Sequence, residues 1–246
     1  MTKASHGGCD GSHLVSTVGV VTGLAFEAAW LREALGKHPG IAEPGIRVAG
    51  ASPARAEAAA RELIEGGARA LLSFGVAGAL YPGLKPGDLV VADRVLSSGG
   101  PDLATDAEWR EAVLAAAQMF SPMRVMPMLT VSKAVSNAEE KARLYRETGA
   151  GTVDMESYGV AKAAAAANVP MLAVRAIGDG PGRSLPRLGA GAIGADGTVK
   201  MGAVLAALLR HPLEIGRLIG AARDTAKARA SLRRVAFREL GALLRA

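Results

Sequence analysis

Four short β-rich runs of the sequence are each followed by residues that could do chemistry. Glu27 follows the first run and the glycine-rich stretch 75–78 follows the second, while Asp154-Met155-Glu156 and Asp179 follow the third and fourth. In open α/β sheets, ligand sites gather at the carboxyl ends of the strands. Carboxylates at such an edge can divide acid and base roles, because burial and neighbouring charges separate their pKa values. The pattern predicts one site built from four strand ends.

Each of these segments also has a purely structural interpretation. Glu27 in a first helical turn is favourable against the helix dipole, and Asp154 or Glu156 could cap the helix that follows. The glycines of 75–78 let backbone N–H groups approach an oxyanion or a sugar, but Gly-x-Ala-Gly after a strand is often only a tight turn. Asp179 before a glycine is an ordinary turn residue. The functional interpretation rests on the fact that all four segments lie at the ends of predicted strands.

The elements that would position these residues alternate along the chain. β-rich runs and Ala-rich helical runs follow one another without an internal repeat or a clear linker, which predicts one α/β domain with a mostly parallel sheet. The expected strands cover residues 17–21, 46–49, 70–74, 88–92, 125–131, a stretch ending near 154, and 171–177. The expected helices cover residues 26–35, 53–64, 106–119, 138–147, 156–167, 203–209 and a stretch from 213 onward.

Composition and charge exclude several classes of protein. Only 4% of the 246 residues are aromatic, so little surface is suited to stacking on bases, and no nucleic-acid partner is expected. Cys9 is the only cysteine, which rules out an intrachain disulfide and a Cys-based zinc cluster, and no metal site is predicted. Residues 1–17 have no apolar periodicity and are interpreted as a flexible leader to a domain spanning 18–246. The apolar run 18–24 follows without a basic region before it and makes a poor signal peptide, so a cytoplasmic location is expected.

The C-terminal tail, residues 201–246, carries the whole net charge. It has nine Lys or Arg against three Asp or Glu, which equals the +6 of the entire chain. Its basic residues alternate with apolar ones in a helical pattern. Such a helix could lie on the inner face of an anionic membrane as a peripheral contact. The favoured alternative is a helix that packs on its own domain and leaves its charged face in solvent.

The four segments together resemble a known superfamily. Residues 22–27 (Thr-Gly-Leu-Ala-Phe-Glu), 73–80 with 84–90, 153–157 (Val-Asp-Met-Glu-Ser) and 174–179 (Val-Arg-Ala-Ile-Gly-Asp) are similar to the ordered motifs of purine nucleoside phosphorylases and methylthioadenosine/S-adenosylhomocysteine nucleosidases. The resemblance implies a nucleoside phosphorylase-like fold, a three-layer αβα sandwich with a central mixed sheet. It also implies a homodimer or higher homo-oligomer that cleaves the N-glycosidic bond of a small-molecule nucleoside.

A narrower resemblance involves further stretches of the chain. Residues 140–150 (Glu-Lys-Ala-Arg-Leu-Tyr-Arg-Glu-Thr-Gly-Ala), 153–158, the pair Leu185-Pro186 and the tail after Gly197 are similar to the hopanoid-associated phosphorylase. This branch is implied to release adenine from adenosylhopane, a lipid-linked 5′-substituted adenosine. The alternatives are a methylthioadenosine/S-adenosylhomocysteine nucleosidase and, from another class, a noncatalytic nucleoside-binding or membrane-associated protein.

The resemblance assigns roles to the carboxylates. Asp179 matches the acid that donates a proton to purine N7, which requires a pKa raised by burial and a nearby carboxylate. Glu156 matches the residue that holds the ribose hydroxyls, with Met155 on the sugar face. Glu27 matches the residue that activates water. The backbone of the glycine-rich stretch, at Gly75, Ala77 and Gly78, is expected to contact the substrate.

The nucleophile is left open between water and phosphate. No cofactor is expected, but inorganic phosphate is a candidate co-substrate. Arg55, near a helix N-terminus, and Gly23 are the candidate phosphate contacts, since helix N-termini bind anions, and a solvated helix residue is the alternative for Arg55. Val76 stands where many relatives have a Ser or Thr hydroxyl, and Gly178 stands where the superfamily usually has Ser before the acid.

Overall fold

The computed structural model describes residues 18–37, 44–183, 215–238 and 240–244. The strands are β1 (Val18–Thr22), β2 (Gly45–Val48), β3 (Ala70–Ala79), β4 (Leu89–Ser97), β5 (Leu103–Ala104), β6 (Met123–Thr130), β7 (Thr152–Asp154) and β8 (Met171–Asp179). The helices are α1 (Ala25–Leu35), α2 (Pro53–Glu65), α3 (Ala107–Ala117), α4 (Ala138–Thr148), α5 (Ser157–Ala167), α7 (Ile215–Arg238) and α8 (Leu240–Leu243). The predicted leader 1–17 and the predicted helix 203–209 lie outside the described residues.

The strands form one mixed sheet that partly closes on itself. Within the described residues, five of the eight strand pairings are parallel. The strand order is β2-β1-β3-β7-β6-β4-β5, and β8 pairs with both β3 and β4. Strands β3, β8, β4, β6 and β7 therefore form a closed ring, from which β1 and β2 extend as an open wing. This closure brings the ends of β3, β7 and β8 together.

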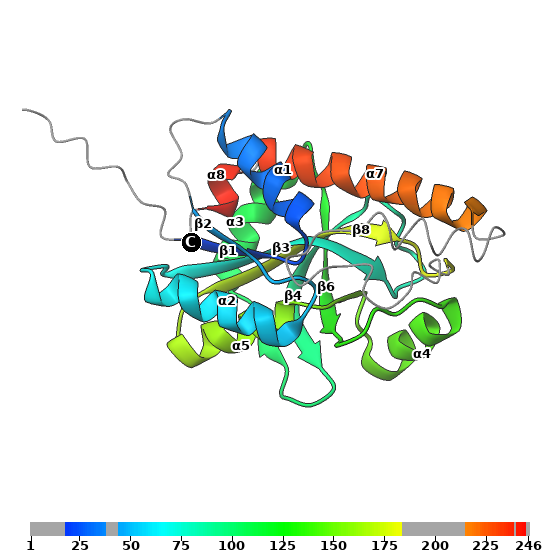
Figure 1. The fold of residues 1–246 in the computed structure, drawn as a ribbon, viewed down its shortest axis with the longest axis horizontal. Helices are drawn as coiled ribbons and strands as arrows, with labels where there is room; N and C mark the ends of the chain where they lie inside the picture. The colour runs from blue at the N-terminus through cyan, green and yellow to red at the C-terminus, as the bar shows by residue number, and fades with distance from the viewer. Residues whose placement is uncertain (1–17, 38–43, 184–214, 239, 245–246) are drawn as a thin grey trace, which may run out of the picture.

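Helices cover both faces of the sheet. Helices α1, α3, α7 and α8 pack on one side, around a core that includes Leu31, Trp109 and Leu232, and α2 and α5 pack on the other side (Figure 1). Helix α4 lies apart from both layers, at the end of the sheet toward which β3 and β8 point. The predicted single-domain, three-layer αβα fold with a mixed, mostly parallel sheet is confirmed.

Local sequence explains where several helices begin and end. The Ser52 side chain accepts a hydrogen bond from the Arg55 backbone N–H at the start of α2, and Pro53 occupies the first helical position, where its missing N–H is tolerated. Asn137 caps α4 in the same way through Glu140. Gly149 ends α4 in the left-handed conformation with φ of 68°.

Strands β3 and β8 are longer than the sequence predicts. The glycine-rich stretch 75–78 lies inside β3, where it pairs with β8 and β7, so the expectation that β3 ends before it is wrong. Strand β8 likewise continues through Gly178 to Asp179. Glycine weakens a strand in isolation, but neighbours on both edges supply hydrogen bonds that local propensity does not reveal.

Helix α7 forms most of the described part of the basic C-terminal tail, which also includes α8. Ala228, Leu232, Val235 and Ala236 form its apolar stripe and are completely buried in the main core, against α1 and the sheet. The packing therefore supports a helix that docks on its own domain, because this apolar stripe is covered by protein. No helix among the described residues is long and apolar enough to cross a membrane.

Replacing Leu232 with alanine tests the docking of α7. Deleting a buried leucine side chain removes its transfer free energy and leaves a cavity, so Leu232→Ala should lower the free energy of unfolding by roughly 3 kcal/mol. Arg223→Ala, at an exposed position of the same helix, should change it by no more than about 0.5 kcal/mol. Urea unfolding measures both variants, and equal small effects would mean that α7 does not pack as described.

Candidate active site

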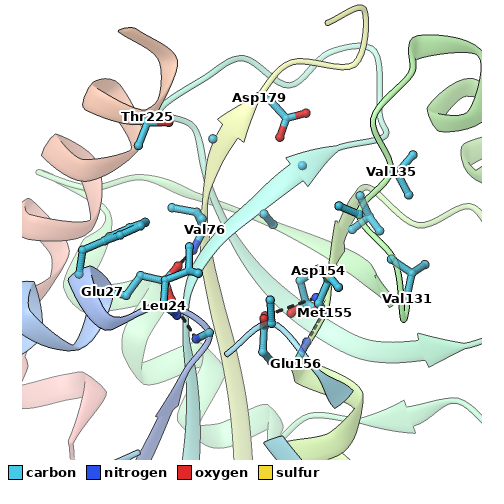
Figure 2. A pocket seen from close by; sticks show the side chains of 18 residues that line it. Leu24, Glu27, Val76, Val131, Val135, Asp154, Met155, Glu156, Asp179 and Thr225 are labelled. Carbon is cyan, nitrogen blue, oxygen red and sulfur yellow. Dashed lines mark hydrogen bonds between the residues drawn. The ribbon is translucent and has the colours of Figure 1, made fainter. Parts of the chain in front are cut away.

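The described site is a cavity of about 390 Å³ at the ends of β1, β3, β7 and β8. Figure 2 shows that Glu27, Glu156 and Asp179 surround it from three sides. Most of the remaining lining is apolar or glycine. The lining residues are Gly23, Leu24, Phe26, Glu27, Ala51, Val76, Ala77, Gly78, Val131, Ala134, Val135, Val153, Asp154, Met155, Glu156, Gly178, Asp179 and Thr225.

Backbone N–H groups hold the carboxylate of Glu27. Its Oε2 accepts hydrogen bonds from Gly23 at 2.9 Å and Leu24 at 2.8 Å, and its Oε1 accepts one from Val76 at 2.8 Å. Glu27 thereby links the end of β1 to the middle of β3. Burial raises the pKa of Glu27 in spite of these three donors. A buried carboxylate with a raised pKa is a stronger base than an exposed one.

Two glycines make room for the carboxylates. A Cβ at Gly75 would lie 2.6 Å from Oε1 of Glu27, and a Cβ at Gly23 would lie 2.5 Å from Oε1 of Glu156. Real Cβ atoms do not approach so closely, so a side chain at either position would displace an acid. Gly75 lies beneath Glu27 and is not itself part of the cavity wall, whereas Gly23 is.

Glu156 stands at the N-terminus of α5 with 6% of its surface exposed. Its nearest described cation is Arg175, with Nη2 at 3.7 Å from Oε2. Burial, followed by the negative charge of Asp154, raises the pKa of Glu156 to about 8. Met155 lies beside Glu156 on the cavity wall (Figure 2). A carboxyl group with this pKa is mostly protonated at pH 7, and its two oxygens can then both donate a hydrogen bond to a hydroxyl group and accept one.

Arg175 forms the core of a buried polar network beneath Glu156. Its Nη2 lies 2.7 Å from Oδ2 of Asp154 and donates to the hydroxyls of Ser73 at 2.7 Å and Ser157 at 3.0 Å. Oδ1 of Asp154 accepts a hydrogen bond from Thr130 at 2.6 Å. Asp154 is thus committed to this network, although it touches the cavity.

Asp179 ends β8 with its carboxyl group at the far side of the cavity from Glu156 (Figure 2). The ammonium of Lys141, which extends from α4, forms an ion pair with its Oδ2. Burial raises the pKa of Asp179, although the charge of Lys141 acts in the opposite direction. The charge of Asp224 on α7 also raises this pKa, so the expected combination of burial and a nearby carboxylate is present.

The structure places every predicted site residue on the cavity wall except Gly75, which lies beneath Glu27, and Arg55. Its guanidinium is exposed and donates to the backbone carbonyl oxygens of Ala49, at 2.6 Å, and Gly50, so it ties down the loop before α2 and does not line the cavity. Gly23 does line it, but its N–H already donates to Glu27. Within the part of the chain that is described, no group of three or more His, Cys, Asp or Glu is placed to hold a metal ion.

Sequence reasoning missed several residues of the site. Thr225 of α7 lines the cavity, and Val131, Ala134 and Val135 form an apolar wall after β6. Lys141 lies in the charged run 139–141, and such a run is typical of a solvent-exposed helix face. The only sequence signal for Lys141 was its place in the motif 140–150, and that motif does not indicate which side chain is buried.

Comparison with known proteins identifies the family. The sequence profile described as the phosphorylase superfamily matches residues 17–210, most of the chain. This chain belongs to the phosphorylase superfamily. The predicted family is confirmed, and the chain is an enzyme of this superfamily. Its curated relatives include a 5′-methylthioadenosine/S-adenosylhomocysteine nucleosidase of Treponema pallidum, which is 29% identical over 220 residues that cover 68% of this chain and 82% of the relative.

Solved structures share the superfamily fold. A putative 5′-methylthioadenosine/S-adenosylhomocysteine nucleosidase of Francisella philomiragia is 18% identical, with a TM-score of 0.68 over 93% of this chain and 99% of that one. The futalosine hydrolase of Helicobacter pylori is 19% identical, with a TM-score of 0.63 over 90% of this chain and 98% of that one. At these identities the likeness concerns the fold, which agrees with the predicted architecture.

The raised pKa of Glu156 predicts how stability depends on pH. Between the ordinary pKa of 4.5 and the folded-state pKa of about 8, the folded chain holds a proton on Glu156 that the unfolded chain has lost. The free energy of unfolding should therefore fall as pH rises through this interval, by about 1.4 kcal/mol per pH unit from this group.

Two variants isolate this contribution. Glu156→Gln keeps the shape without the titration, so its stability should vary less with pH than that of the unmodified enzyme. Glu65→Gln, at an exposed position, should leave the pH dependence unchanged. Urea unfolding at several pH values gives the comparison. A parallel pH dependence in Glu156→Gln and the unmodified enzyme would contradict the prediction.

Proposed function

We propose that this phosphorylase superfamily member hydrolyses the N-glycosidic bond of a 5′-substituted adenosine and releases adenine. The observation that carries the proposal is the placement of Glu27, Glu156 and Asp179 around one cavity. Breaking this bond builds positive charge on the ribose and negative charge on the base. Each carboxyl group can meet one of the three needs that follow: a proton for the base, a grip on the sugar and an activated nucleophile.

Asp179 supplies the proton to the departing base. Burial raises its pKa, which favours the protonated form that a general acid needs, and the carboxyl group transfers this proton to purine N7 as the C1′–N9 bond breaks. Glu156 accepts hydrogen bonds from the ribose hydroxyls from the opposite side of the cavity. Met155 packs against the sugar face beside it. The sugar is thereby fixed between the acid and the nucleophile.

The contacts of Glu27 favour water over phosphate as the nucleophile. The backbone N–H groups of Gly23, Leu24 and Val76 would suit a phosphate oxygen, but the carboxylate of Glu27 already accepts from all three. A phosphate dianion placed here would meet a like charge and find no free donor among them. Water needs a base, and Glu27 is a buried base with a raised pKa. The side chain of Val76 also supplies no hydroxyl group that could donate to a phosphate.

The lining of the cavity favours an apolar 5′ substituent. Apart from the acids, Thr225 and the glycines, its described side chains are aliphatic, aromatic or, at Met155, a thioether. An apolar wall formed by Val131, Ala134 and Val135 can bury a hydrocarbon group but gives no partner to an ammonium or a carboxylate. This supports adenosylhopane, which the motif at 140–150 first suggested. Methylthioadenosine, the smaller apolar alternative, is favoured by the Treponema pallidum relative.

A substrate panel tests the reaction and the nucleophile together. The purified enzyme is incubated with adenosylhopane, methylthioadenosine, S-adenosylhomocysteine and inosine, each with and without inorganic phosphate. We expect adenine from an adenosine derivative with an apolar 5′ group, at a rate that phosphate does not change. Adenine that forms only with phosphate would reject hydrolysis. Release of no base from any substrate would reject the enzyme and favour a noncatalytic nucleoside-binding protein.

Asp179→Asn tests the assignment of the acid. An amide of the same shape cannot transfer a proton to the base, so kcat should fall by about 10²–10⁴-fold. Asp102→Asn, at an exposed position that pairs only with Arg94 among the described residues, should retain the full rate. Adenine release measured at pH 7 compares the two variants. A near-normal rate in Asp179→Asn would remove Asp179 from the mechanism.

A further inference from the structure

Helix α4 buries a lysine at the edge of the site. Lys141 is the one buried residue of this helix, all of whose residues are described, and its side chain has no exposed surface. Its ammonium group pairs with Asp179 and donates to the backbone carbonyl oxygens of Gly180, at 2.9 Å, and Arg183, at 3.2 Å. All three donors of the ammonium group therefore have an acceptor. These partners hold the buried ammonium group in one position.

The position of this cation has a direct chemical consequence. A buried carboxyl group prefers to keep its proton, whereas a general acid must release it to the base at the right moment. When the proton leaves, a negative charge forms on Asp179 inside a largely apolar cavity. The ammonium of Lys141 already lies against that carboxyl group, so the charge forms next to its counter-ion.

We propose that Lys141 is a positioning residue for Asp179: it holds the carboxyl group toward the cavity and stabilises the negative charge that forms as the proton leaves. The inference rests on the proposed function. During the step the C1′–N9 bond breaks, its electron pair goes to the purine, and the Asp179 proton moves to N7. Water supplies the new C1′–O bond and gives a proton to Glu27. Lys141 keeps all its protons throughout.

Lys141 also fixes the turn that follows β8. It binds the carbonyl oxygens of Gly180 and Arg183 from the side of α4, while the guanidinium of Arg183 pairs with Asp224 of α7 at 2.5 Å. The acid is thus held between two helices from distant parts of the chain. The described charged groups that act on Asp179 are Lys141 on α4, Arg183 in the turn and Asp224 on α7.

The first test measures the titration of Asp179 without relying on turnover. The carboxyl carbon of Asp179 is followed by NMR in ¹³C-labelled enzyme and assigned with Asp179→Asn. Lys141→Met removes the positive charge, so the pKa of Asp179 should rise by ~1 unit or more. Lys162→Met, which removes an exposed lysine that pairs with Glu57, should leave it unchanged. An unchanged pKa in Lys141→Met would reject the proposal whether or not the enzyme cleaves nucleosides.

The second test separates the acid step from the fold. Methylthioadenosine needs a proton on its leaving group, whereas a nitrophenyl 5-methylthioriboside does not. With Lys141→Met we expect kcat for methylthioadenosine to fall about tenfold or more, with its alkaline limb moved to higher pH, and nitrophenol release to stay near normal. Lys141→Arg keeps the charge and should recover part of the loss. In the Asp179→Asn background, Lys141→Met should have no further effect.

Several outcomes would overturn the proposal. An equal loss on both substrates with an unshifted pH profile would mean that Lys141 only supports the fold. A further loss in the Asp179→Asn background would mean that it acts by another route. If Lys141→Met does not fold, Lys141→Gln, which keeps a donor without the charge, replaces it in every comparison. Adenine release by the unmodified enzyme reports separately on the proposed function.

Discussion

One buried guanidinium holds the floor of this active site together. Arg175 is almost fully buried, and a charge in that environment is tolerated only when it is paired and hydrogen-bonded. Its partners Asp154, Ser73 and Ser157 belong to β7, β3 and α5, so one side chain ties three further elements to β8 at a single point. Moving Asp154 would leave a buried charge without its counter-ion, and moving either serine would remove a hydrogen-bond acceptor. Glu156 stands directly above this network, which gives its carboxyl group a fixed support.

Crowding of acids in a small space explains other features of the site. The carboxylates of Glu27 and Glu156 approach the backbone so closely at Gly75 and Gly23 that a Cβ would collide with them. These glycines therefore make room for an acid and are not needed to form a turn. Strand β3 continues through Gly75 as an ordinary strand. The same crowding raises the pKa values of both acids: burial opposes the ionisation of each, and the negative charges of Asp154 and Glu27 add to this effect at Glu156. The steric and electrostatic properties of the site have one origin.

The C-terminal helix α7 is an integral part of the domain, although its basic composition does not suggest this. Its basic, amphipathic pattern is typical of a helix on a membrane surface, yet Leu232 and its neighbours are buried in the main core. Thr225 reaches the cavity and Asp224 holds Arg183 in the turn after the acid. The apolar stripe that a membrane would need is used by the protein itself. Packing against the sheet thus gives the tail a role in shaping the site.

The sequence by itself determined the fold class, the family and the positions of the three acids, because strand ends and local motifs are encoded by neighbouring residues. It did not determine which glycines serve a turn and which make room for a carboxylate. It also could not distinguish Lys141 from the exposed charges beside it, or show that Arg55 binds backbone carbonyls. These properties depend on what lies opposite each side chain, and only the closure of β3, β7 and β8 and the docking of α4 and α7 decide that.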